Sequence, residues 1–262
     1  MRMALEVASS VLAAGMIVAW HAPASAQQAG AAAPAMETEA VDAVKKMGAY
    51  LSGLESFALS ADTTRDDITE TGQNVEFASH LELKARRPDR LRLDVTSDSR
   101  QRQYFYDGTT VTVYSPITGA FGVVDTPPTI RETIEVAALD YDLEVPLADL
   151  FLWGTDSDDV DALTDAFVVG PSSVDGIACD HYAFRQEGVD WQIWIRSEDP
   201  PLPCKLVITT TSEESRPRYE ATLTWDTGAS MADGDFVFTP KDEDYEILIQ
   251  PASAVTQSDS AQ

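Results

Sequence analysis

Few residues in this 262-residue chain are of the types that carry out acid–base chemistry. Of the three histidines, His21 lies in an apolar segment near the N-terminus, and His80 lies on the charged face of a predicted strand. His181 stands between Asp180 and Tyr182 in the middle of another predicted strand. This position favours a histidine packed among its neighbours over a general base. A hydrolase that uses His181 with a neighbouring acid is the enzymatic alternative.

The sequence lacks the short motifs of common catalytic and metal sites, namely G-x-S-x-G, H-E-x-x-H, Walker A and C-x-x-C. The acids Asp156, Asp158, Asp159 and Asp161 have a spacing that resembles part of a calcium-binding loop. Such a loop needs an oxygen ligand at its fifth position and glycine at its sixth, where this chain has Val160 and Asp161. We therefore predict that these acids lie at the start of a short helix, and that the protein has no metal site, no cofactor and no catalytic residues.

The chain is strongly acidic, with a formal net charge of −26 and a pI of about 4.2. Nucleic acids and anionic membranes carry the same sign of charge and are therefore excluded as partners. The charge is best explained as a solvated surface that keeps an exported monomer soluble.

The first 26 residues have the pattern of a secretory signal peptide. A short apolar run, Val7–Trp20, is followed by the small-residue pattern Ala24-Ser25-Ala26, which predicts cleavage after Ala26. The run falls short of the ~20 residues that a membrane-spanning helix needs. No cysteine follows it, so we predict an exported protein without a lipid anchor.

The two cysteines, Cys179 and Cys204, are candidates for a disulfide, because the predicted compartment is oxidising. If 177–185, 189–196 and 204–211 form a meander, both cysteines lie opposite Arg196, on its two sides. Their Cα atoms are then about 9.6 Å apart, two strand spacings, whereas a disulfide needs them within ~7 Å. A bridge requires the middle strand to end early or the sheet to curl, so both outcomes stay open.

Beyond residue 26 the sequence divides into a spacer, one domain and a tail. Residues 27–36 are rich in Ala, Gln and Gly, and we predict that they are disordered, as are residues 251–262. The single domain, 37–250, is long enough for one well-packed core.

Helical patterns occur in two parts of this domain. Thr38 is predicted to cap an amphipathic helix that ends near Gly53. A helical insertion follows in the middle of the chain: Thr129 caps one helix, Pro146 opens a second, and a third begins near Asp158.

A β-hairpin is predicted where Asp107-Gly108 separates two runs rich in Tyr, Phe, Thr and Val. A two-residue turn at this pair places Tyr106 opposite Thr109 and Tyr104 opposite Val111. Both faces of the hairpin are apolar, which indicates that something covers each side of the sheet here.

The remaining segments alternate between apolar and polar residues with the period of a strand, and a polar hinge is expected at 63–73. They predict a mainly β (α+β) fold: one strongly curved antiparallel sheet, or half-open β-barrel, of about ten to eleven strands, with the helices on its concave side. The last full strand is predicted at Phe236–Phe238, and an edge strand at Tyr245–Ile249.

A half-open barrel of this length is wider than its own side chains fill, so a cavity for an apolar ligand is the default hypothesis. The alternative is a filled core without a cavity. The candidate lining residues share an apolar face of the sheet or lie on the helical insertion. They are Leu81, Leu83, Leu91, Leu93, Val95, Tyr104, Tyr106, Leu147, Leu150 and Phe151.

Several motifs resemble those of the LolA/LolB lipoprotein carriers of the periplasm. These are Arg87-Pro88-Asp89-Arg90-Leu91, Tyr106-Asp107-Gly108-Thr109, Tyr114-Ser115-Pro116 and the ending Phe236-Val237-Phe238-Thr239-Pro240. The second half, CDHYAFRQEGVDWQIWI followed by PLPCKLVIT, is similar to a DUF2092-type family of predicted periplasmic proteins in the same superfamily.

The resemblance implies a periplasmic half-open barrel that holds acyl chains or a lipoprotein lipid under a helical lid. In the carriers the arginine before the proline helps to latch the lid, and the matching residue is Arg87. The longer second half and the acidity depart from the carriers. The superfamily also includes RseB-like envelope-stress sensors, so a non-enzymatic module that binds an envelope protein is the alternative.

Overall fold

The computed structural model describes residues 36–141, 145–155 and 159–251. The predicted signal peptide and most of the predicted spacer lie outside these ranges, as does the tail from residue 252. Residues 34–262 make up one compact unit, and the account below concerns the described part of that unit.

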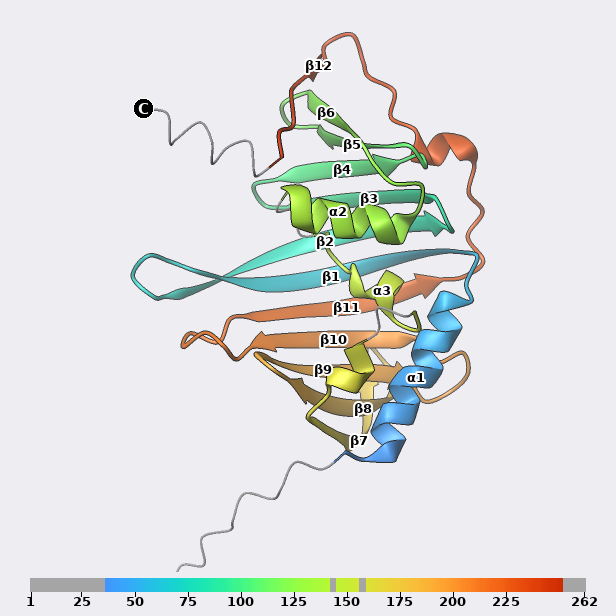
Figure 1. Ribbon diagram of the computed structural model, residues 1–262, viewed down its shortest axis with the longest axis vertical. Helices are drawn as coiled ribbons and strands as arrows, with labels where there is room; N and C mark the ends of the chain where they lie inside the picture. The colour runs from blue at the N-terminus through green and yellow to red at the C-terminus, as the bar shows by residue number, and fades with distance from the viewer. Residues whose placement is uncertain (1–35, 142–144, 156–158, 252–262) are drawn as a thin grey trace, which may run out of the picture. The chain divides into compact units, whose positions relative to one another are not determined.

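A single twelve-stranded sheet forms the body of the domain (Figure 1). Its strand order is β12-β6-β5-β4-β3-β2-β1-β11-β10-β9-β8-β7. All neighbours are antiparallel except β12 and β6. The strands are β1 Ser56–Ile68, β2 Asn74–Arg86, β3 Arg90–Ser97, β4 Gln101–Tyr106, β5 Thr110–Ser115, β6 Ala120–Asp125, β7 Asp165–Val174, β8 Ile177–Gln186, β9 Val189–Arg196, β10 Pro203–Thr210, β11 Arg218–Asp226 and β12 Tyr245–Glu246.

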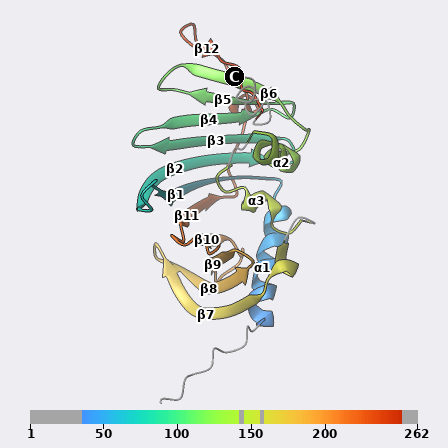
Figure 2. The ribbon, with the colours of Figure 1, turned by 60° about the vertical axis from the view of Figure 1, so that its left-hand side comes forward.

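The sheet is strongly curved and open, since its two edge strands, β12 and β7, stand at opposite ends of the order (Figure 2). The predicted fold class is therefore confirmed, with twelve strands in place of ten or eleven. The predicted hinge at 63–73 is wrong over most of its length: β1 and β2 continue as a paired hairpin out to Ile68 and Asn74.

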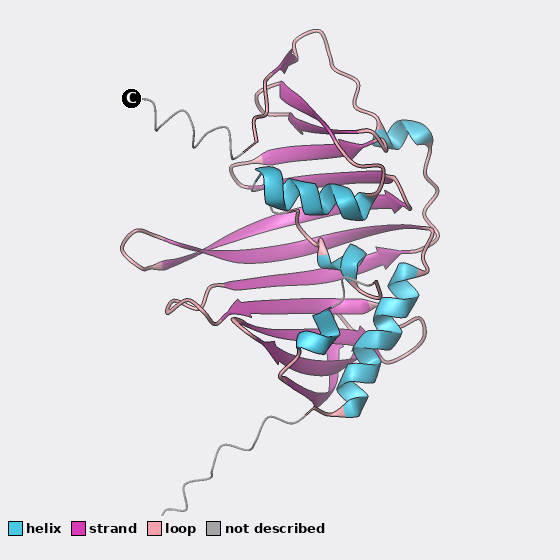
Figure 3. Cartoon of the chain, in the orientation of Figure 1, coloured by secondary structure: helices cyan, strands magenta, loops and turns pink. Residues whose placement is uncertain are grey.

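The helices lie on the concave side of the sheet, as predicted (Figure 3). They are α1 Thr38–Ser52, α2 Ile130–Tyr141, α3 Asp149–Leu152 and the 3₁₀ turn η1 Asp159–Ala162. Thr38 is the first helical residue of α1 and Glu37 takes the cap position, one residue earlier than predicted. Thr129 caps α2 as predicted, because its Oγ1 accepts the backbone N–H of Glu132 at 3.2 Å.

The hairpin at Asp107 is present, but its turn differs from the prediction. Tyr106 pairs with Val111 and Tyr104 with Val113, so four residues, 107–110, make the loop. The Asp107 carboxylate accepts backbone N–H groups from Thr109 and Thr110, which stabilises this longer turn. Because the register moves by two residues, every side chain stays on its predicted face.

The C-terminal segment corrects a further prediction. Phe236–Phe238 does not complete the sheet: Phe236 ends a 3₁₀ turn, η2 Asp233–Phe236, and Phe238 follows it. The Phe238 ring lies 5.5 Å from Phe105 and 4.8 Å from Tyr114, on the convex side. This segment is the cover that the two-sided hairpin required.

Candidate functional site

The core between the sheet and its helices contains a small apolar cavity beneath α2. Its volume is about 60 Å³, which holds a few water-sized groups and is well below the 300–1,000 Å³ of typical ligand sites. Strands β3, β4 and β5 form its floor, and α2 forms its roof. The lining residues are Leu91, Leu93, Tyr104, Tyr106, Val111, Val113, Ile130, Thr133, Ile134, Ala137 and Val145.

Four of the predicted ligand-binding residues therefore meet at this cavity: Leu91, Leu93, Tyr104 and Tyr106. The others lie elsewhere in the same hydrophobic core. Four of them are only 1% exposed, namely Leu81, Leu83, Leu150 and Phe151. None of these four lines the cavity beneath α2 or the groove beside it. Leu83 instead borders a groove on the convex face. Leu147 lines a neighbouring groove, and Val95 is partly buried against the core.

That groove lies where α2 approaches the short helix α3, and its volume is about 770 Å³. It shares Ile134 and Val145 with the cavity, so the two spaces adjoin. The groove is lined by α2, by the ends of β1, β10 and β11, and by residues 145–149. These residues are Arg65, Asp66, Asp67, Ile134, Ala138, Val145, Pro146, Leu147, Ala148, Asp149, Ile208, Thr210, Glu213, Pro217, Arg218 and Tyr219.

The carboxyl group of Asp149 stands out in this groove. Burial raises its pKa above the usual range, and the hydrogen bond from its own backbone N–H offsets part of that effect. The two arginines of the groove are paired with other acids: Arg65 with Asp67, and Arg218 with Glu220. Sequence reasoning missed Asp149, although a lone acid within the apolar run LADLFLW was a usable signal.

The two ends of α2 are held differently. At its start, the Ile130 N–H donates to Pro88 O at 2.8 Å, and the Tyr106 hydroxyl donates to Pro127 O at 2.6 Å. The buried residues of α2 all belong to its first half, whereas Leu139 near its end is 82% exposed. The helix is thus attached firmly at its N-terminal end.

Arg87, the predicted latch residue, lies against α3. Its Nη2 donates to Leu150 O at 3.5 Å, and its guanidinium lies 5.3 Å from the centre of the Phe151 ring. Burial lowers the pKa of Arg87 below the usual arginine range. The contact joins the turn after β2 to the short helix of the insertion.

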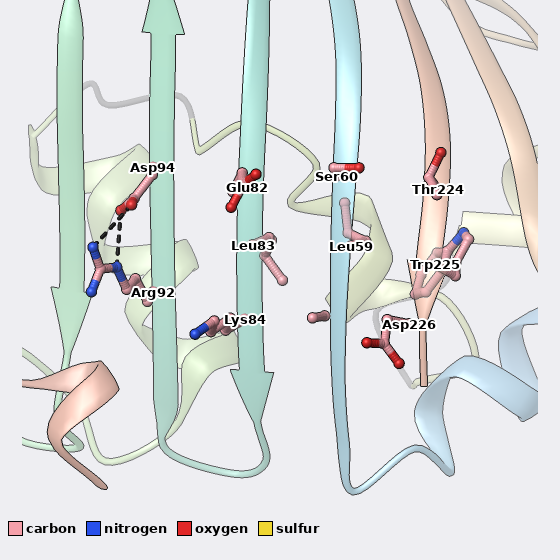
Figure 4. Close-up of a pocket in the computed structure, with 11 residues that line it drawn as sticks. Leu59, Ser60, Glu82, Leu83, Lys84, Arg92, Asp94, Thr224, Trp225 and Asp226 are labelled. Carbon is pink, nitrogen blue, oxygen red and sulfur yellow. Dashed lines mark hydrogen bonds and ion pairs between the residues drawn. The ribbon is translucent and has the colours of Figure 1, made fainter. Parts of the chain in front are cut away.

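The convex face carries a second, polar groove of about 470 Å³ (Figure 4). Charged and polar side chains of β3, β2, β1 and β11 line up across it, as the alternating pattern predicted. Arg92 donates two hydrogen bonds to Asp94, at 3.1 and 3.0 Å, so the charges of these two side chains compensate each other. Leu59, Leu83 and Trp225 border the groove from the core side.

The two described histidines occupy structural positions. His80 bonds Asp62 at 2.7 Å on the convex face, and this hydrogen bond raises the pKa of His80. His181 stacks on Trp194, with ring centres 3.8 Å apart, and donates to Gln192 Oε1 at 3.0 Å. Burial lowers the pKa of His181, because it disfavours the charged form of the ring.

The structure describes only part of the acidic segment that was considered as a calcium-binding loop. Asp156 and Asp158 lie outside the described residues, and η1 begins at Asp159, close to the predicted helix start. In the described part of the chain no group of three or more His, Cys, Asp or Glu residues is placed to hold a metal ion. No helix within the described ranges is long and apolar enough to cross a membrane.

Cys179 and Cys204 form a disulfide on the convex side, with their Cα atoms 7.2 Å apart. Cys179 pairs with Arg196, the last residue of β9. The register of β10 against β9 shifts between Pro203 and Lys205, so Cys204 lies in a bulge. β9 ends at Arg196, as predicted, so it is the bulge that brings the cysteines closer than two full strand spacings.

A protein-family model described as "Predicted periplasmic protein (DUF2092)" matches residues 40–250. Among curated proteins, none matches the chain. Solved structures with a similar fold include the lipoprotein LppX of Mycobacterium tuberculosis, with 11% identity and a TM-score of 0.47 over 74% of this chain and 99% of that one. LprF of Mycobacterium bovis has 12% identity and a TM-score of 0.41 over 76% and 97%. A LolA superfamily protein of Nitrosomonas europaea has 10% identity and a TM-score of 0.34 over 76% and 97%.

Proposed function

The chain belongs to the DUF2092 family of predicted periplasmic proteins, and from this we propose that it is a periplasmic binding or carrier protein for a hydrophobic ligand. The ligand class is an acyl chain, a lipid or the lipid moiety of a lipoprotein. It lies between the concave face of the sheet and α2, and the protein has no catalytic role.

The observation that carries this proposal is that the apolar cavity lies directly beside the larger groove. The cavity alone is too small for an acyl chain, but Ile134 and Val145 border both spaces, so a small displacement of these side chains would join them. A chain that enters from the groove lifts the weakly packed end of α2, while the anchored end near Pro127 acts as the hinge.

The energetics favour such a site without polar recognition. Each buried methylene contributes roughly 0.8 kcal/mol, so ten contribute about 8 kcal/mol before the cost of opening the lid. Arg87 is proposed as a latch, because its contacts with Leu150 and Phe151 hold the insertion against the sheet.

The proposal includes export. The signal peptide is cleaved after Ala26, and the mature chain is a monomer without a lipid anchor. A protein of the envelope that supplies or receives the ligand is the expected partner, and the net charge of −26 makes a nucleic acid an unsuitable one.

The test is native mass spectrometry of the mature protein after mild purification from a periplasmic extract, together with uptake of the neutral fluorescent probe N-phenyl-1-naphthylamine. We expect a bound lipid-like mass and saturable uptake. Leu93→Glu places a charge in the cavity and should abolish uptake. Ala137→Phe fills the cavity from the lid side without a charge and should reduce uptake in a protein whose circular dichroism is unchanged.

Leu139→Glu is the matched control, because Leu139 is 82% exposed on the outer side of the same helix. Its uptake should equal that of the wild type. Absence of both bound lipid and uptake in the wild type would overturn the proposal. That result would favour a filled core and a module that binds an envelope protein.

A further inference from the structure

The groove beside α3 differs from the cavity in its polarity, and this difference bears on the ligand's head group. The cavity walls are apolar, apart from the Thr133 and tyrosine hydroxyl groups. The groove walls include the charged residues Arg65, Asp66, Asp67, Asp149, Glu213 and Arg218. A chain that occupies the cavity therefore leaves its head group in the groove.

Most of these charged groups already have partners within the protein. The Arg65 guanidinium lies 2.9 Å from Asp67, and the Arg218 guanidinium lies 2.7 Å from Glu220. Asp66 accepts the backbone N–H of Arg218 at 3.0 Å. The arginines are thus neutralised by carboxylates and offer little attraction to a second, incoming anion.

Glu213 is exposed to solvent, so Asp149 is the buried exception. It is the first residue of α3 and lines the groove with Leu147, Ala148 and Val145, and burial is the main influence on its carboxyl. A carboxylate removed from water without a countercharge is unfavourable for the folded protein. A ligand that brings a cationic hydrogen-bond donor to this carboxyl relieves that cost.

We propose that the groove selects a single-chain amphiphile with a positively charged amine head, which Asp149 binds while the alkyl chain runs beneath α2. This inference rests on the proposed function and adds the head-group class to it. A fatty acid is disfavoured, because its carboxylate would lie beside Asp149. The net charge of the protein also favours the approach of cations over anions.

The test compares three probes of equal chain length, dodecylammonium, dodecanol and dodecanoate, at pH 7.5 and 0.15 M salt. Each displaces the neutral fluorescent probe N-phenyl-1-naphthylamine from the mature full-length chain. A hydrogen bond between charged groups corresponds to about tenfold or more in affinity, so dodecylammonium should bind about tenfold more tightly than dodecanol, and dodecanoate more weakly than either.

Asp149→Asn removes the carboxylate and keeps the side-chain shape. It should lower the affinity for dodecylammonium about tenfold and leave that for dodecanol within about twofold. Glu187→Gln removes one charge from the exposed β8–β9 turn and is the matched control for net charge. It should change neither affinity by more than about twofold, because exposed charges at this distance are screened.

The outcomes separate the two proposals. If all three probes bind but dodecanoate equals dodecylammonium, or if Asp149→Asn behaves like Glu187→Gln, the head-group inference is wrong and the carrier proposal stands. If none of the probes displaces N-phenyl-1-naphthylamine from the wild type, both proposals fail.

Discussion

Two helices cover the concave face of one sheet, yet they are held in different ways. α1 buries Ala40, Val44, Met47 and Leu51 almost completely, along most of its length. α2 buries only Ile130, Thr133 and Ile134, all in its first half, and it covers a cavity. The half of the core beneath α1 is closely packed, whereas the half beneath α2 contains the apolar cavity.

The backbone of α1 also comes very close to the backbone of the segment that follows α3. A Cβ atom added at Gly48 would lie 2.7 Å from the backbone nitrogen of Gly154, so only glycine fits there. α2 contains no glycine, and it is attached at its start by the backbone hydrogen bond from Ile130 to Pro88. The first helix is fixed by backbone contact, and the second by its start alone.

The largest expected difference is in local opening. Backbone amides of α1 should exchange with deuterium at least about a hundredfold more slowly than those of residues 136–141 in α2, a difference of about 3 kcal/mol in opening free energy. Hydrogen exchange followed by mass spectrometry measures both helices in one experiment. Equal protection would erase the distinction between the two halves.

The next effect concerns the disulfide, which belongs to the α1 half of the sheet. Replacing both cysteines (Cys179→Ala with Cys204→Ala) should lower the free energy of unfolding by about 3 kcal/mol, since the bridge closes a 25-residue separation. Urea denaturation gives the value, and exchange in α2 should stay unchanged. A wild type whose midpoint is unaffected by dithiothreitol would contradict this prediction.

A pair of small substitutions tests the packing directly. Gly48→Ala should destabilise the protein by about 2 kcal/mol, because the added methyl group meets the Gly154 backbone. Ala137→Val adds bulk beside the cavity and should cost less than about 0.5 kcal/mol. Thermal unfolding of both variants provides the ranking, and a reversed order would show that the two halves are packed alike.

The last effect involves Asp149 and depends on pH. Burial raises the pKa of this carboxyl in the folded state, so the unfolded chain loses the proton first as the pH rises. The folded state is therefore progressively destabilised from about pH 4 up to the raised folded pKa. Asp149→Asn should be more stable than the wild type by about 1 kcal/mol at pH 7.5.

This advantage should shrink as the pH falls and vanish below about pH 3, where Asp149 is protonated in both states. Melting temperatures of the two proteins across this range give the measurement. An advantage that stayed constant with pH would point to packing and not to charge.

The faces of the sheet were predictable because a period of two is a local property. Leu91 and Leu93 lie inside, and Arg92 and Asp94 lie outside, as the alternation predicted. The predicted turn at Asp107 had two residues between the paired positions, whereas the structure has four. The Asp107 carboxylate accepts the backbone N–H of Thr109, and this Asx hydrogen bond favours the longer loop over the two-residue turn that an Asp-Gly pair predicts.

The features that depend on distant contacts were beyond the sequence pattern. Phe236 and Phe238 alternate like strand residues, but Phe238 packs against Phe105 and Tyr114 on the convex face, and Phe236 packs beneath the Arg86 guanidinium. The bulge at Cys204 likewise depends on the neighbouring strands. A cavity was one of the two predicted alternatives, whereas the burial of Asp149 and the uneven packing of α2 required the three-dimensional arrangement.

The strand order has a consequence for biosynthesis. β1 lies in the middle of the sheet and pairs on one side with β11, where Ala58 meets Asp226. The sheet therefore stays incomplete until nearly the whole chain has been made, and contacts of such long sequence separation form slowly. In the export that we propose, the polypeptide is threaded through a membrane before it folds, and this delay would keep the emerging chain in a transport-competent state.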